Sequence, residues 1–191
     1  MVLLNYGTIT RCFATGRVHE KKDTDLGAAA GLVQGNYGTV EESWANVEAH
    51  SLSGAGGLVW ANESTGVISN SYAVGASSGG WAGGLVGGNA GKISNSYSSG
   101  TVNGADYSGG LIGFDSSSSG SLSNNYWDTD TSAITNLSQG AGNIANDPGI
   151  TGLTTEQFQS GLPAGFDPNI WAENSGVNNG LPYLIANPPP K

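Results

Sequence analysis

The sequence Gly84-Leu85-Val86-Gly87-Gly88-Asn89, followed by Gly91-Lys92-Ile93-Ser94-Asn95-Ser96-Tyr97, sets the architecture of the chain. Its first part recurs at steps of 26, 27 and 26 residues, as Gly31-Leu32-Val33, Gly57-Leu58-Val59, Gly84-Leu85-Val86 and Gly110-Leu111-Ile112. Its second part recurs at residues 38–44, 66–72, 91–97 and 120–126, with an earlier copy at 7–13. Such self-similarity at a fixed period is the signature of a repeat architecture.

Each unit holds short apolar pieces that are separated by Gly, Asn and Ser and that alternate with the period of a strand. One unit cannot bury its apolar face alone, but stacked units can. Equivalent residues of successive units would then form three rows: Ile9, Val40, Ile68, Ile93 and Leu122; Leu32, Leu58, Leu85 and Leu111; and the aromatics Phe13, Trp44, Tyr72, Tyr97 and Tyr126.

The period therefore predicts an all-β fold, a right-handed parallel β-solenoid (β-helix) of about five coils over residues 1–127. A β-sandwich of short strands is the main alternative, although it does not require near-identical units in fixed register. Residues 128–191 leave the period and predict an irregular C-terminal cap, with a short helix beginning after Thr154. We expect Phe158, Phe166, Trp171 and Tyr183 to cover the last coil.

The unit at residues 84–102 resembles the GLUG repeat of bacterial surface adhesins of the filamentous-haemagglutinin type, a repeat that also occurs in some IgA-specific metallopeptidases. The resemblance covers roughly residues 28–127. It implies secretion or cell-surface display as part of a larger protein, and binding rather than catalysis. It supplies no catalytic residue here, because no His-Glu-x-x-His motif is present.

The amino-acid composition limits the classes of partner that the chain can bind. The 191 residues include 32 Gly and carry a formal net charge of −9, and Lys92 is the only base between Asp23 and Pro190. Such a surface repels phosphate backbones, so we expect no nucleic-acid partner. No apolar run is long enough to span a membrane, and no signal peptide is visible at the N-terminus. With a single cysteine, Cys12, no intrachain disulfide can form.

Candidate binding residues lie outside the three rows. Trp60, Trp81 and Tyr107 occupy corner segments beside Asp106 and Asp115, where aromatic rings and carboxylates could bind a glycan. Asp128 and Asp130 alternate with Thr129 and Thr131 and form a candidate calcium site, since calcium prefers oxygen ligands. A host-surface protein or a small molecule remains an alternative ligand, and the truncated first coil predicts end-to-end self-association.

Two further rows are expected to be structural. Asn70, Asn95 and Asn124 would stack inward as an amide ladder. Ser94 and Ser96, with their counterparts, would form an outward hydroxyl face, which also suits a binder of ice.

The leading hypothesis is an adhesin-type binding or structural module. The alternative is a calcium-dependent hydrolase or lyase on the same scaffold, acting on a polysaccharide or on a small ester or lactone. The sequence selects no catalytic residue for it.

Overall fold

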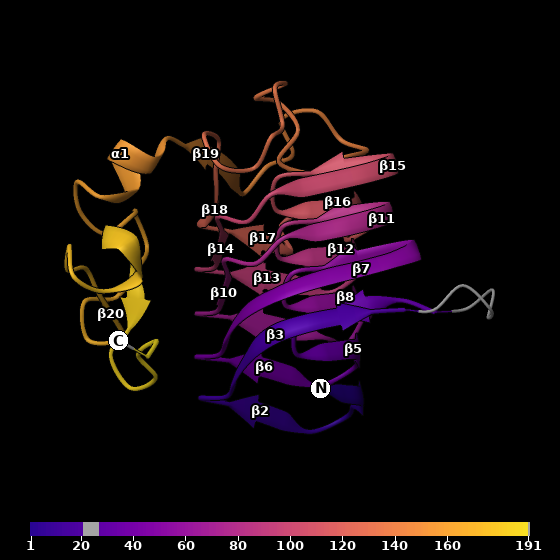
Figure 1. The fold of residues 1–191 in the computed structure, drawn as a ribbon, viewed down its shortest axis with the longest axis horizontal. Helices are drawn as coiled ribbons and strands as arrows, with labels where there is room; N and C mark the ends of the chain where they lie inside the picture. The colour runs from indigo at the N-terminus through magenta and orange to yellow at the C-terminus, as the bar shows by residue number, and fades with distance from the viewer. Residues whose placement is uncertain (21–26, 191) are drawn as a thin grey trace.

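The computed structural model describes residues 1–20 and 27–190, in which the chain winds into a parallel β-solenoid of about five turns (Figure 1). The strands of the repeat region pair in parallel with the strands one repeat away, because every repeat presents the same short apolar piece at the same place. The predicted all-β solenoid is therefore confirmed. Among the described residues, helical structure is limited to α1 (Thr155–Phe158) and the 3-10 turn η1 (Asn178–Gly180).

Two five-stranded sheets form two sides of the coils; the Leu row lies directly before the strands of the first sheet, and the row from Ile9 to Leu122 lies in the second. The first sheet consists of β1 (Val2–Asn5), β5 (Val33–Asn36), β8 (Val59–Asn62), β12 (Val86–Asn89) and β16 (Ile112–Asp115). The second consists of β2 (Thr8–Thr10), β6 (Thr39–Glu41), β9 (Val67–Ser69), β13 (Lys92–Ser94) and β17 (Leu122–Ser123). Their registers align Val59 with Val86 and Ile68 with Ile93, as the repeat predicts.

The third sheet is larger and has nine strands. They are β3 (Phe13–His19), β4 (Ala29–Ala30), β7 (Trp44–Gly56), β10 (Tyr72–Ala73), β11 (Ser77–Gly83), β14 (Tyr97–Ser98), β15 (Val102–Gly109), β18 (Asn125–Asp128) and β19 (Ile150–Leu153). A separate antiparallel pair, β20 (Trp171–Ala172) and β21 (Tyr183–Leu184), belongs to the C-terminal segment.

The core lies inside the coils, where the two predicted aliphatic rows meet. Leu58, Leu85 and Leu111 are fully buried, as are Ile68 and Ile93. Each such side chain contributes about 1.5–3 kcal/mol relative to exposure. Stacking the coils is therefore what makes each short strand stable.

An amide ladder runs along the core, but it is built from a different set of residues than predicted. Asn5 donates through Nδ2 to Asn36 Oδ1, Asn36 donates to Asn62, and Asn62 donates to Asn89, each over 2.8 Å. Asn89 in turn donates to Asp115 Oδ1 over 2.7 Å. These five side chains are all buried, so the ladder satisfies polar groups that the core would otherwise leave unpaired.

The inward direction predicted for the ladder of Asn70, Asn95 and Asn124 is wrong, since these residues form corners, and the side-chain hydrogen bond between two of them, from Asn124 Nδ2 to Asn95 Oδ1 over 3.1 Å, is exposed. Their φ angles are 44°, 49° and 52°, in the left-handed region that Asn tolerates better than most residues. The corner interrupts the alternation of the strand, so Ser71 and Ser96 turn inward and are fully buried. The outward hydroxyl face predicted for Ser94 and Ser96 is therefore wrong for Ser96, whereas Ser94 is half-buried.

The aromatic row, which we call the flank row, points outward from the coils. It consists of Phe13, Trp44, Tyr72, Tyr97 and Tyr126, which align in register on successive strands. Neighbouring rings stack, with centroids 5.8 Å apart for Trp44–Tyr72 and 5.1 Å apart for Tyr72–Tyr97. Except for Phe13, the row is buried, because the C-terminal segment packs over it with Phe158, Phe166, Trp171, Leu181 and Leu184.

The C-terminal segment thus lies along the side of the solenoid and does not cap its end (Figure 1). It runs back past four coils, and near its end Asn187 donates to the carbonyl oxygens of Cys12 and Glu42. Phe166 does contact Tyr126 of the last coil, with ring centroids 5.7 Å apart, but Phe158 and Trp171 pack on Tyr97 and Tyr72 of earlier coils. The expectation that Phe158, Phe166, Trp171 and Tyr183 together cover the last coil is therefore wrong, because the flank row offers a larger apolar surface.

Residues 132–153 add one more irregular rung beyond β16 and β18. Leu111 donates its N–H to Gly140, Ala141 bridges to Ile112, and β19 pairs with β18. Stacking therefore continues past residue 127, and the predicted domain division there stays a prediction.

At the opposite end, β1, β2 and β3 each leave one edge unpaired in the described chain. Leu3 and Tyr6 are 65% and 72% exposed there.

Candidate functional site

A second set of aromatic rings, the corner row, lies at another corner of the solenoid and consists of Trp60, Trp81, Tyr107 and Phe114. The ring centroids are 6.2 Å apart for Trp60–Trp81, 4.8 Å for Trp81–Phe114 and 6.0 Å for Trp81–Tyr107. All four side chains are half-buried. Unlike the flank row, the corner row has no segment of the described chain packed over it as a second apolar cluster.

Glycines of the repeat provide the space in which these rings lie. A Cβ atom at Gly54 or at Gly87 would overlap the Trp60 ring, and one at Gly88 would touch the Trp81 ring at 3.8 Å. The two Trp side chains can therefore lie against the backbone of neighbouring strands. A larger residue at Gly87 would push the Trp60 ring away from this position.

A shallow hollow of about 210 Å³ opens between the rings. Trp60, Trp81 and Phe114 form its apolar walls, while Glu63 and Ser116 bring a carboxylate and a hydroxyl to its rim. This combination of ring faces with a few polar groups is what a sugar ring requires of a protein surface.

Sequence reasoning missed Glu63 and Ser116, although the repeat carries a signal for them. Both residues directly follow a member of the amide ladder, and the intervening unit has Ala90 at the equivalent place. A small alanine between Glu63 and Ser116 leaves room at the corner, and Ala90 indeed lines the hollow.

The structure separates the predicted ligand-binding residues. Trp60, Trp81 and Tyr107 come together in the corner row, and Asp106 is exposed next to Tyr107 on β15, near Gly80 of the neighbouring strand. Asp115 points inward instead, because it is the last member of the amide ladder. It is therefore not part of the hollow.

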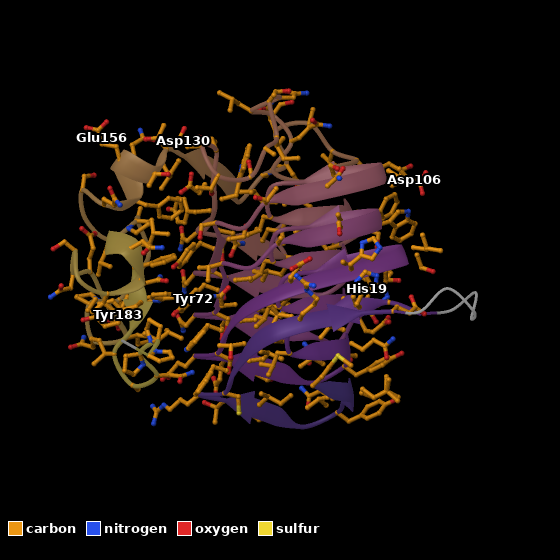
Figure 2. All side chains as sticks on the ribbon, in the orientation of Figure 1. His19, Tyr72, Asp106, Asp130, Glu156 and Tyr183 are labelled. Carbon is orange, nitrogen blue, oxygen red and sulfur yellow. The ribbon has the colours of Figure 1, made fainter. Side chains whose placement is uncertain are left out.

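Of the predicted metal ligands Asp128 and Asp130, Asp130 lies on the opposite side of the solenoid from Asp106 (Figure 2), and Asp128 is hydrogen-bonded to it. Asp128 Oδ1 accepts the N–H groups of Asp130 and Thr131, and its Oδ2 accepts the hydroxyl of Thr155. Asp130 Oδ2 accepts the N–H of Thr155. These bonds fix the start of α1, as carboxylates do at helix N-termini. Calcium at this pair stays a prediction.

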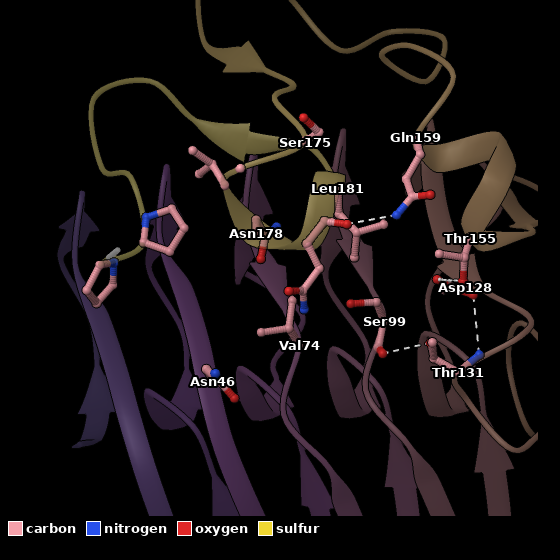
Figure 3. Close-up of a pocket in the computed structure, with 15 residues that line it drawn as sticks. Asn46, Val74, Ser99, Asp128, Thr131, Thr155, Gln159, Ser175, Asn178 and Leu181 are labelled. Atoms are coloured by element: carbon pink, nitrogen blue, oxygen red, sulfur yellow. Dashed lines mark hydrogen bonds between the residues drawn. The ribbon is translucent and has the colours of Figure 1, made fainter.

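A larger polar cavity of about 510 Å³ lies between the flank of the solenoid and the C-terminal segment (Figure 3). Asn46, Val74, Ser99 and Asp128 line one side, and η1 lines the other. In the described part of the chain, no group of three or more His, Cys, Asp and Glu side chains gathers that could hold a metal ion. The cavity therefore shows polar space without such a metal-binding cluster among the described residues.

Fold and site together define a repeat-built β-solenoid module with an open aromatic surface at one corner. Among known families, the model of the GLUG motif matches residues 79–103, which form a single repeat unit around β11 and β13. Neither a search of curated proteins nor a search of solved structures gave a significant match. The GLUG resemblance is thus confirmed for this unit, and the filamentous-haemagglutinin type stays a prediction. No described helix has the length and hydrophobicity needed to cross a bilayer.

Proposed function

We propose that the chain is an adhesin-like binding module, displayed at a cell surface or secreted as part of a larger protein, which binds a glycan at the corner row. The observation that carries the proposal is the hollow between Trp60, Trp81 and Phe114. The GLUG match and the stiff stack of coils support a display role.

Charge indicates which sugars suit the hollow. Glu63 is its single charged lining residue, and the chain carries a net charge of −9. The Glu63 carboxylate also raises the pKa of Tyr37, which places negative charge at this corner. A neutral or amino sugar is therefore favoured over a uronate or a sialic acid, which the carboxylate would repel.

The test is a glycan array that contains neutral, amino and acidic oligosaccharides, followed by titration calorimetry of the hits. Substitution Trp81→Ala removes one wall of the hollow, and we expect it to weaken binding about tenfold or more. Leu137→Ser serves as the control, because Leu137 is an exposed apolar residue outside both the hollow and the first coil.

Binding that survives Trp81→Ala unchanged, or hits confined to acidic glycans, would contradict the proposed site. If the module bound a host-surface protein and no glycan, the ligand would be a protein, which is the alternative class, and the glycan proposal would fail. The hydrolase or lyase alternative stays a prediction, and no contact in the structure favours it.

We also propose that two copies associate end to end through the first coil. The unpaired edges of β1, β2 and β3 and the exposed side chains of Leu3 and Tyr6 support this. Sedimentation velocity over a range of concentrations should show a dimer that Leu3→Ser together with Tyr6→Ser shifts to monomer. A monomer at all concentrations would contradict it.

A further inference from the structure

The amide ladder has a direction. Every Asn donates its Nδ2 toward the next coil, from Asn5 through Asn36, Asn62 and Asn89 to Asp115. At the starting end, Asn5 Oδ1 accepts the N–H of Gly7. The N–H ends of the stacked amide dipoles therefore all point toward the Asp115 carboxylate.

The amide ladder ends at Asp115, whose carboxylate lies next to a second carboxyl group, that of Asp147. The Asp115 carboxylate is satisfied by Asn89 at Oδ1 and by Ser117, whose hydroxyl donates to Oδ2 over 3.0 Å. Against it lies Asp147, from the irregular last rung. The two side chains are only 4% and 8% exposed, and Asp147 Oδ2 is buried with no hydrogen-bond partner among the described residues.

Two ionised carboxylates in this position would repel each other, because they carry like charges. Neither of them could donate a hydrogen bond to the other. The segments packed around them, residues 116–121 and 132–146, contain no charged side chain. On β13, which also contributes to this end, Lys92 is exposed. Asp115 is thus the charged group that acts on Asp147. A metal would need further ligands, and no third His, Cys, Asp or Glu joins the pair in the described chain.

We propose that Asp115 and Asp147 share one proton, and that this proton locks the last rung onto the solenoid. Protonated Asp147 donates its O–H to the Asp115 carboxylate and so becomes the final donor–acceptor step of the ladder. When the proton leaves, the two charges repel, and the rung of residues 132–153 loosens from β16 and β18.

The direction of the pH dependence follows from the pKa. Burial, and then the neighbouring Asp115 charge, raises the pKa of Asp147 to about 6, compared with about 3.9 for an unfolded Asp. The stabilising contribution is therefore complete below about pH 4 and is lost progressively as the pH rises through about 6. A shift of this size corresponds to a change of about 10- to 100-fold in the equilibrium between locked and loosened rung.

The test is hydrogen exchange of the amides that hold the last rung, measured from pH 4 to pH 7.5 and corrected for the intrinsic pH dependence of exchange. The probes are Gly142 N–H, which bonds Ile112, and Asn125 N–H, which bonds Gly149. In the wild type, their protection should fall 10- to 100-fold over this range. The amide of Val67, which bonds Gly38 in a distant coil, should not follow.

Asp147→Asn supplies a permanent amide donor to Asp115, so it should keep the probes protected at every pH. Asp115→Asn removes the charge that faces Asp147 but leaves Asp147 buried, so it should weaken the pH dependence, and it serves as a second variant if the first folds poorly. Asp106→Asn removes an exposed carboxylate outside the pair and should behave like the wild type.

Equal pH profiles for the wild type and Asp147→Asn would overturn the shared proton. So would a wild-type profile that changes when calcium is replaced by a chelator, because a cation would then occupy the place of the proton.

Discussion

The flank row and the corner row are both made of aromatic rings that project outward from successive coils, yet their surroundings differ. The flank row is buried by the C-terminal segment, and Tyr72 and Tyr97 are fully inaccessible. The corner row stays half-buried, with a hollow between its rings. The same chemistry therefore serves as an internal interface on one side of the solenoid and remains partly accessible at the surface on the other.

The largest effect should come from removing the cover of the flank row. Trp171 is almost completely buried against Tyr72 and Tyr97, so Trp171→Ala should lower the free energy of unfolding by about 3–5 kcal/mol. Trp81→Ala in the corner row should cost about 1 kcal/mol or less, because the ring is partly exposed. Urea denaturation of both variants measures the contrast, and equal losses would show that the corner row is also structural.

A smaller effect distinguishes two tyrosines within the flank row. The Tyr97 hydroxyl donates to Pro182 O and accepts from Asn178, whereas the Tyr72 hydroxyl is buried with no partner among the described residues. Tyr97→Phe should therefore destabilise the protein by about 1–3 kcal/mol, and Tyr72→Phe should leave stability unchanged or slightly raised. Thermal unfolding of the two variants provides the measurement. A loss on Tyr72→Phe as large as that on Tyr97→Phe would argue against this arrangement.

The repeat made the interior of the solenoid predictable. The aliphatic rows lie where the spacing places them, since equivalent residues of stacked units must meet. The corners were harder to predict from the sequence, because the left-handed backbone at Asn70, Asn95 and Asn124 reverses which side chains point inward. The buried ladder did leave a signal, as Asn36, Asn62, Asn89 and Asp115 recur with the period of the repeat.

The path of the C-terminal segment could not be predicted in this way, because it contains no repeat and its partners are distant in sequence. Trp44 Nε1, for example, donates to the carbonyl of Asn187. For the candidate site, the sequence identified Trp60, Trp81 and Tyr107 but placed Asp115 beside them. The alternation along β16 turns Phe114 outward and Asp115 inward. The neighbouring carboxyl group of Asp147 comes from a rung that the repeat period does not describe.

The path of the C-terminal segment also has a mechanical consequence. A stack of coils in which each touches only its neighbours can be peeled apart from one end, one rung at a time. Here the segment contacts Tyr126 at one end of the stack and the coil of Cys12 at the other, so it acts as a splint parallel to the axis. A load along that axis must shear this splint from all the coils that it contacts before any rung can separate. The module should therefore yield to tension in one abrupt step.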